Sequence, residues 1–144
     1  MKWIFVVIGL LCTALPAEAR NTEHNYPVAD ALRDGQGAAR VGADVRTYFA
    51  EAKHPPISKQ MGIWETRKST RGVFRSDEAS CHVAFISAIL QLQKRARSEG
   101  GNGVVEIVSI TRGSETSSPT HYRCVAGATV VHVGLKGRVV QLKQ

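Results

Sequence analysis

One segment of this chain carries the start and stop signals of a helix together with a helical spacing of its apolar residues. Ser76 and Asp77 favour the N-cap position, and Glu78 suits the positive end of the helix dipole. Gly100-Gly101 supplies the left-handed backbone on which many helices end. The apolar residues recur three and four positions apart, at Cys81, Phe85, Ala88, Leu92 and Ala96. We therefore predict a helix from about Glu78 to Ser98 with one face in the core.

The residues after this helix have the dense β-branched content of strands. We predict three strands there: Val104–Ile110, Tyr122–Val133 and Arg138–Leu142. A polar loop is expected over Thr111–Pro119. Gly127 predicts a bulge or bend inside the long second strand, and Gly134–Gly137 predicts a tight turn into the last strand.

The residues before the helix predict two further strands. Val45–Phe49 is β-branched and aromatic, and His54-Pro55-Pro56 ends it because proline restricts the backbone on both sides. Ile63–Arg67 is the second strand, closing at Ser69–Gly72. The residues from 20 to 43 show little periodicity, so we predict an irregular N-terminal lead-in.

The first nineteen residues have the parts of an export signal. Lys2 supplies the positive start, and an apolar run from Trp3 to Leu15 follows, too short to span a bilayer. Ala17-Glu18-Ala19 is a small-x-small cleavage site, so we expect a mature chain that begins at Arg20, the alternative being a retained anchor. Cys12 follows a leucine, where a lipoprotein signal needs a small residue. No later stretch is apolar for long enough to be a membrane helix.

The mature chain keeps two cysteines, Cys81 and Cys124. In an oxidising compartment an even number of cysteines usually forms disulfides, and only one pairing is possible here. We therefore predict a structural Cys81–Cys124 bridge from the helix to a strand. Together, the elements predict the α+β class: a single domain over residues 44–144 in which one long helix packs on a mainly antiparallel sheet.

The composition is that of a globular protein, with 43% hydrophobic and 22% charged residues. The formal net charge of +7 suits several anionic partners, such as an envelope component, a glycan or a lipid. Nucleic acid is not expected as a partner of an exported protein with only nine aromatic residues, since stacking on bases needs aromatic surface.

Several motifs of the C-terminal half resemble a family of small exported proteobacterial proteins that often carry the automatic label "excinuclease ATPase subunit". They are Ser76-Asp77-Glu78-Ala79-Ser80-Cys81, Leu90-Gln91-Leu92-Gln93, Gly101-Asn102-Gly103-Val104-Val105, Tyr122-Arg123-Cys124-Val125-Ala126-Gly127 and Gly134-Leu135-Lys136-Gly137. The chain has no phosphate loop ending in Gly-Lys-Ser or Gly-Lys-Thr, so we expect no nucleotide hydrolysis. The helix-to-strand junction is also similar to the Rcs stress-sensor lipoprotein and to YbjQ-like domains.

A catalytic alternative uses Cys81 and His132. A thiol at a helix N-terminus has a lowered pKa. The later strand with His132-Val133-Gly134 resembles the strand that carries the catalytic base in papain-like cysteine cell-wall hydrolases. The residues after Cys81 are His82-Val83 rather than the Ser-Gly of those enzymes, and a bridged cysteine is not a nucleophile. We therefore expect no catalytic residues and no enzyme activity.

Neither metal nor cofactor binding is predicted. The five histidines have no spacing that brings two of them onto one ion; the label of YbjQ-like domains as heavy-metal-binding keeps a metal-binding module as an alternative. Four cations that run from the end of the second predicted strand to the helix form a candidate anion-binding run: Arg67, Lys68, Arg71 and Arg75, with Trp64 and Phe74 nearby. Lys94, Arg95 and Arg97 complement the C-terminal end of the helix dipole.

The sequence thus predicts a periplasmic or secreted, disulfide-bonded, non-catalytic binding or envelope-associated accessory protein. A cysteine cell-wall hydrolase and an anion-, lipopolysaccharide- or metal-binding module are the alternatives.

Overall fold

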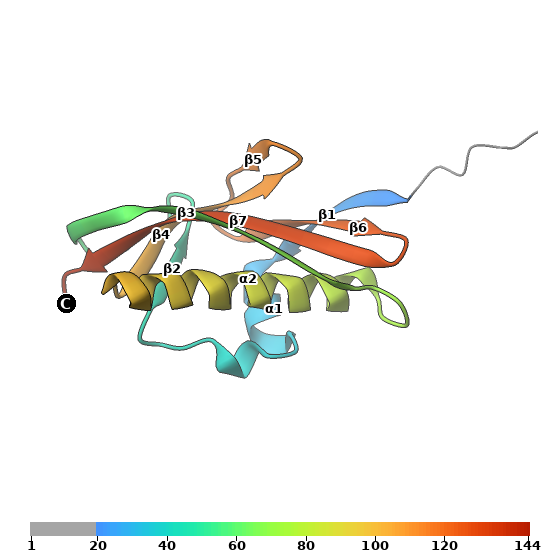
Figure 1. Ribbon diagram of the computed structural model, residues 1–144, viewed down its shortest axis with the longest axis horizontal. Helices are drawn as coiled ribbons and strands as arrows, with labels where there is room; N and C mark the ends of the chain where they lie inside the picture. Colours follow the sequence, from blue (N-terminus) through green and yellow to red (C-terminus); the bar gives the residue numbers. More distant parts are fainter. Residues whose placement is uncertain (1–19) are drawn as a thin grey trace, which may run out of the picture.

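The computed structural model describes residues 20–144, so the predicted export signal lies outside the described residues. Its elements in chain order are β1 (Asn21–Pro27), α1 (Val28–Asp34), the 3-10 turn η1 (Ala38–Arg40), β2 (Arg46–Phe49), β3 (Ile57–Arg71), α2 (Asp77–Glu99), β4 (Gly103–Thr111), β5 (Ser114–Thr116), β6 (His121–Gly127) and β7 (Val130–Leu142). Both helices lie on the same side of one seven-stranded sheet (Figure 1). Among the described residues, no helix is long and apolar enough to cross a membrane.

Helix α2 confirms the strongest prediction from the sequence. Ser76 is the N-cap, and its side chain accepts a hydrogen bond from the backbone N–H of Ala79. Gly100 ends the helix in the left-handed conformation, at φ 81°. The five apolar positions of the predicted stripe are all buried. The caps therefore act as the sequence indicates, and the stripe forms the centre of the core.

Strand β7 is the central strand of the sheet. β3 pairs with it antiparallel along almost its whole length, from Ile57 opposite Leu142 to Arg71 opposite Val130. On its other side, β7 pairs first with β6 and then with β4. β1 extends the sheet beside β6, β5 forms a hairpin with β4, and β2 pairs with β4 in parallel. The predicted α+β class with a mainly antiparallel sheet is confirmed.

The two faces of the sheet have different roles. Val131, Val133 and Leu135 of β7 are buried in the core beneath α2. Their neighbours His132 and Lys136 point to the opposite face, because successive side chains of a strand alternate. We call this helix-free side the open face. A small second cluster forms there from Val105, Val140 and Leu142, with Tyr48 and Ile57 packed against it.

The predicted irregular lead-in over residues 20–43 is wrong. Seven residues of this segment form β1, which pairs with β6 from Asn21 opposite Gly127 to Pro27 opposite His121. α1 follows directly and places Val28 and Ala31 in the core. The segment has few β-branched residues, so its pairing depends on the tertiary contact with β6 rather than on its own propensity. The folded unit therefore begins before residue 44.

The predicted layout of the last strands is also wrong. The chain turns at residues 128–129, so Tyr122–Val133 is split between β6 and β7, and β7 runs through the expected turn at Gly134–Gly137. A Cβ on Gly134 would lie 2.5 Å from the carbonyl oxygen of Ile110, and a Cβ on Gly137 would lie 2.6 Å from Cγ1 of Val104. These glycines allow close packing inside a strand. Two smaller differences are that the expected loop at 111–119 contains β5 and that β3 is far longer than Ile63–Arg67.

Candidate functional site

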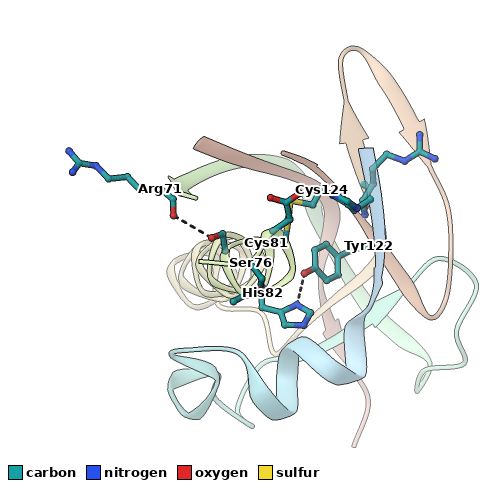
Figure 2. The surroundings of a disulfide bond; sticks show 12 residues. Arg71, Ser76, Cys81, His82, Tyr122 and Cys124 are labelled. Carbon is teal, nitrogen blue, oxygen red and sulfur yellow. Dashed lines mark hydrogen bonds and ion pairs between the residues drawn. A yellow bond between two sulfur atoms is a disulfide. The ribbon is translucent and has the colours of Figure 1, made fainter. Parts of the chain in front are cut away.

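The disulfide predicted from the sequence joins α2 to β6. Cys81 lies in the first turns of α2 and Cys124 in β6, with a Cα–Cα distance of 5.9 Å, and both residues are buried (Figure 2). The bridge closes a segment of 43 residues. A cysteine in this state has no thiolate to attack a substrate, since nucleophilic catalysis requires the free sulfur.

His132 lies on the other side of the sheet. Its Nδ1 atom is 2.6 Å from Oγ of Ser69, the residue opposite it on β3, and both side chains are on the open face. Cys81 packs against the helix-side face instead. The structure therefore does not bring together the thiol and the imidazole that the hydrolase alternative requires.

The predicted anion-binding run is divided by the strand geometry. Arg67 lies on the open face, where Nη1 is 3.1 Å from Oε2 of Glu65. Lys68 is the next residue of β3 and points toward α2, because side chains alternate along a strand. Arg71 ends β3, and Arg75 stands in the loop beyond it. The four cations therefore do not converge on one anion-binding site.

A hollow of about 460 Å³ on the helix side gathers cations from three elements. η1 contributes Arg40, β3 contributes Lys68, and α2 contributes Lys94 and Arg97. We call it the basic hollow. Its remaining lining is Ser87, Leu90 and Gln91, so its lining contains no carboxylate. Like charges repel when they converge, and an anion bound among them relieves that repulsion.

Local structure explains how α2 faces this hollow. Leu90 and Gln91 lie three and four residues after Ser87, and Lys94 lies four and three residues after them, which places all four on one stripe of the helix. Lys94 is exposed. The stripe gives the hollow one apolar side chain, two neutral hydrogen-bonding groups and a cation.

The buried side chain of Gln93 holds the segment that follows Arg40 against α2. Its Nε2 atom donates to the carbonyl oxygens of Gly42 and Val45, each at 2.8 Å, and its Oε1 accepts from the N–H of Gly42 at 3.2 Å. These bonds fasten the segment after η1 to α2. Arg40 is therefore carried close to the cations of α2 by three hydrogen bonds of one buried amide, which use both of its N–H donors and one lone pair of its oxygen.

Asp44 lies at the rim of the basic hollow and binds one of its cations. Its carboxylate accepts from Nε and Nη2 of Arg97 at 2.7 and 2.8 Å. This bidentate pairing lowers the pKa of Asp44 from its usual 3.8 to about 2 and raises the pKa of Arg97. Among the described residues, Arg40, Lys68 and Lys94 form no ion pair with a carboxylate. The hollow thus keeps three cations available for a ligand.

A second hollow, of about 360 Å³, lies on the open face. Ser69 and His132 line it together with Arg67, Arg112 and Ile110. A serine bonded to a histidine is one element of hydrolytic machinery, but here the imidazole uses Nδ1 for the serine and no carboxylate lines the hollow to orient it. We therefore regard this hollow as a weaker candidate site.

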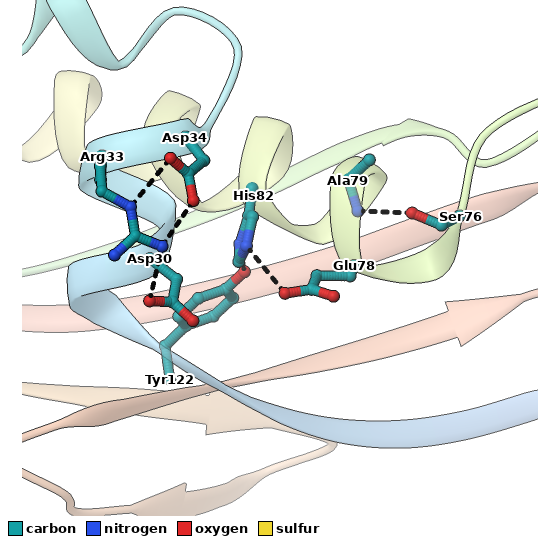
Figure 3. A network of polar contacts seen from close by, with 8 residues as sticks. All are labelled: Asp30, Arg33, Asp34, Ser76, Glu78, Ala79, His82 and Tyr122. Carbon is teal, nitrogen blue, oxygen red and sulfur yellow. Dashed lines mark hydrogen bonds and ion pairs between the residues drawn. The ribbon is translucent and has the colours of Figure 1, made fainter.

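A third hollow, of about 340 Å³, opens beside the N-terminal half of α2. The buried His82 lies at its base, with Nδ1 2.6 Å from the Tyr122 hydroxyl and Nε2 3.5 Å from Oε1 of Glu78 (Figure 3). Burial is the main cause that raises the pKa of Tyr122 far above its usual value. Within residues 20–144, no three His, Cys, Asp or Glu side chains converge to hold a metal ion.

Sequence reasoning missed the basic hollow because its members are far apart in the chain. In the sequence Lys68 groups with Arg67, Arg71 and Arg75, and Lys94 and Arg97 complement the helix dipole. Arg40 stands in the segment that we expected to be irregular. No signal in the sequence links Arg40 to Lys94. A scan against protein-family models, a search of curated proteins and a search of solved structures each find no match for this chain.

Proposed function

We propose that this protein is an exported, non-catalytic binding protein that takes an anionic group of an envelope glycan or lipid into the basic hollow. The observation that carries this proposal is the convergence of Arg40, Lys68, Lys94 and Arg97 in a lining without a carboxylate. Phosphate, sulfate and carboxylate groups accept charge-assisted hydrogen bonds from such cations, and an arginine can bind them through two parallel bonds.

The neutral lining of the basic hollow favours a group carried on a larger molecule. Ser87 and Gln91 offer hydrogen bonds to hydroxyl groups beside the anion, and Leu90 offers an apolar contact. A phosphorylated or acidic sugar combines these features. The volume of about 460 Å³ suits a group of that size.

Export is supported by the buried disulfide and by the signal-like N-terminal sequence. Disulfides persist in oxidising compartments and are rare in reducing ones. Intact mass of the protein isolated from the periplasm or the medium tests this part of the proposal. We expect a chain that begins at Arg20 and takes up an alkylating agent at two cysteines only after reduction. A free thiol before reduction, or a retained N-terminal segment, would contradict it.

Matched charge removal tests the basic hollow. The double variant Lys68→Gln/Lys94→Gln removes two cations from the hollow, and the control Lys59→Gln/Lys143→Gln removes two exposed cations elsewhere, so the net charge is the same. On immobilised lipopolysaccharide and on heparin, we expect the hollow variant to elute at a clearly lower salt concentration than the control. Equal shifts of both variants would show that retention depends on net charge alone and would overturn the proposal.

A further inference from the structure

The loop between β3 and α2, residues 72–75, exposes two adjacent apolar side chains. Phe74 is fully exposed, at 104% of its reference area, and Val73 is 43% exposed. Within residues 20–144 the only other large apolar side chains with comparable exposure are the isolated Leu32 and Ile63. The loop lies at the same end of the molecule as the turn between β6 and β7 (Figure 1). We call residues 72–75 the tip loop.

The backbone holds Phe74 outward. Phe74 has a φ of 64°, in the left-handed region that bulky side chains rarely adopt because the Cβ crowds the following carbonyl. The loop is anchored on both sides of this residue. The N–H of Gly72 donates to the carbonyl of Thr129 at 2.8 Å, and Ser76 caps α2. The fully exposed ring of Phe74 buries no surface in the protein, so its own packing does not compensate for the strained backbone.

Two arginines flank the exposed ring. Arg71 and Arg75 are both exposed, and neither forms an ion pair with a carboxylate among the described residues. Figure 2 shows the side chain of Arg71 extending away from α2 and the sheet. Asp77 and Glu78 follow the loop in the chain, and Asp34 lines the third hollow together with Arg75 and Glu78. Asp77 is bound by Arg20 and His24, Glu78 is turned toward His82, and Asp34 is bound by Arg33 (Figure 3). The tip loop therefore combines apolar side chains with unpaired positive charge.

We propose that the tip loop docks on the surface of an anionic lipid bilayer, independently of the basic hollow. The side chains of Phe74 and Val73 enter the interface between headgroups and acyl chains, and Arg71 and Arg75 contact lipid phosphates. Aromatic side chains favour this interface, and each cation near an anionic surface adds attraction. Two protruding apolar side chains are too little for a stable protein interface, which buries about 1,000 Å² or more. A bilayer, by contrast, accepts a single protruding ring without a complementary pocket.

The docking is expected to be weak and reversible, since one aromatic ring and two charges are a small anchor. Co-sedimentation with vesicles measures this binding. The wild type and all variants are isolated in the exported form and begin at the same residue. We expect binding to vesicles of phosphatidylcholine with about 30% phosphatidylglycerol to exceed binding to phosphatidylcholine alone, and to fall with salt. Phe74→Asn should lower the partition coefficient about tenfold. Arg71→Gln and Arg75→Gln should each lower it about fivefold.

Two controls make these results specific. Ile63→Ser removes an exposed apolar side chain of β3, and Arg112→Gln removes an unpaired cation of the β4–β5 turn, so neither should change vesicle binding. Asparagine tolerates the left-handed backbone, so Phe74→Asn should fold at least as stably as the wild type. A Phe74→Trp variant should show blue-shifted emission with anionic vesicles, while the wild type, which keeps Trp64, should not. Absence of binding by the wild type, or equal binding by Phe74→Asn and Ile63→Ser, would overturn the proposal.

Failure of this proposal is distinguishable from failure of the proposed function. The tip loop is tested by Phe74→Asn on phospholipid vesicles, and the basic hollow is tested by Lys68→Gln/Lys94→Gln on immobilised glycolipid and heparin. If a protein partner occupies the tip loop instead, the vesicles stay unbound and the bilayer proposal is wrong.

Discussion

The hydroxyl of Tyr122 lies 2.6 Å from Nδ1 of His82. His82 follows Cys81 by one residue on α2, and Tyr122 precedes Cys124 by two residues on β6, so this contact lies beside the disulfide. The Tyr122 ring also stacks on Phe85, with ring centroids 4.2 Å apart. The N-terminal half of α2 is thus fastened to a single strand by a covalent bond, a hydrogen bond and an aromatic contact. Figure 2 shows the disulfide and the hydrogen bond. Oε1 of Glu78 lies 3.5 Å from Nε2, on the other side of the imidazole ring.

Removing the phenol hydroxyl should destabilise the protein. In Tyr122→Phe the Nδ1 atom of the buried His82 loses its partner, and leaving a buried polar atom unpaired costs about 1 to 3 kcal/mol. Urea denaturation measures the free energy of unfolding. Tyr48→Phe, at a half-buried tyrosine outside this cluster, should change it by less than about 0.5 kcal/mol. Equal losses in the two variants would contradict the assigned role of the His82 bond.

Stability should fall at alkaline pH because of Tyr122. Burial raises the pKa of Tyr122 in the folded protein, whereas the unfolded chain ionises near the ordinary value of 10.0. Above that pH the unfolded state releases a proton that the folded state retains, so the free energy of unfolding decreases as the pH rises. Unfolding curves from pH 8 to 11 should show this slope. Tyr122→Phe should have a shallower one, and an unchanged slope would refute the assignment.

Loss of the disulfide should have a large effect on stability. For a loop of 43 residues, the chain-entropy model gives about 4 kcal/mol. We expect Cys81→Ala/Cys124→Ala to lower the free energy of unfolding by about that amount. Reduced wild-type protein should approach the stability of the double variant. A change below about 1 kcal/mol would mean that packing of α2 alone holds the helix on the sheet.

Gly137 should not tolerate even one methyl group. In Gly137→Ala the added Cβ would lie 2.6 Å from Cγ1 of Val104 in the core, and overpacking of this kind costs about 1 to 3 kcal/mol. Gly72→Ala is the matched control, because its Cβ would meet only ordinary contacts of 3.6 Å and longer. Thermal unfolding should therefore shift for the first variant and not for the second. Equal behaviour would indicate that Gly137 lies in a turn, as the sequence suggested.

Asp44 should weaken anion binding in the basic hollow. Its carboxylate holds Arg97 and adds a negative charge at the rim, so Asp44→Asn is expected to raise the affinity for heparin about twofold to threefold at low salt.

The ion pair of Asp44 with Arg97 contributes stability above the usual pKa of 3.8, and this contribution is lost as the pH falls toward about 2. NMR titration of the Asp44 carboxyl measures this pKa. Unchanged or weaker heparin binding by Asp44→Asn would contradict the role at the rim.

Local chemistry was sufficient to predict one helix and one covalent bond. Ser76 and Gly100 act within a single helical turn, so their effect can be read from their position in the chain. The pairing of Cys81 with Cys124 followed because the sequence after residue 19 has no other cysteine. The β-branched content after the helix likewise predicted strands and hence the α+β class.

Strand boundaries and the basic hollow depended on contacts between distant segments. Gly134 and Gly137 resemble turn glycines in sequence, yet the demand for small residues comes from Ile110 and Val104 across the sheet. β1 forms because β6 offers it a partner.

By itself the sequence determined where α2 begins and ends, which of its residues are buried and which cysteines pair. Only the tertiary structure decided that Lys68 turns away from Arg67 and meets Arg40 and Lys94. Helix caps and apolar periodicity act over a few residues, whereas the meeting of these cations depends on the register of β3 and on the bonds of Gln93. Such long-range geometry is a property of the packed chain.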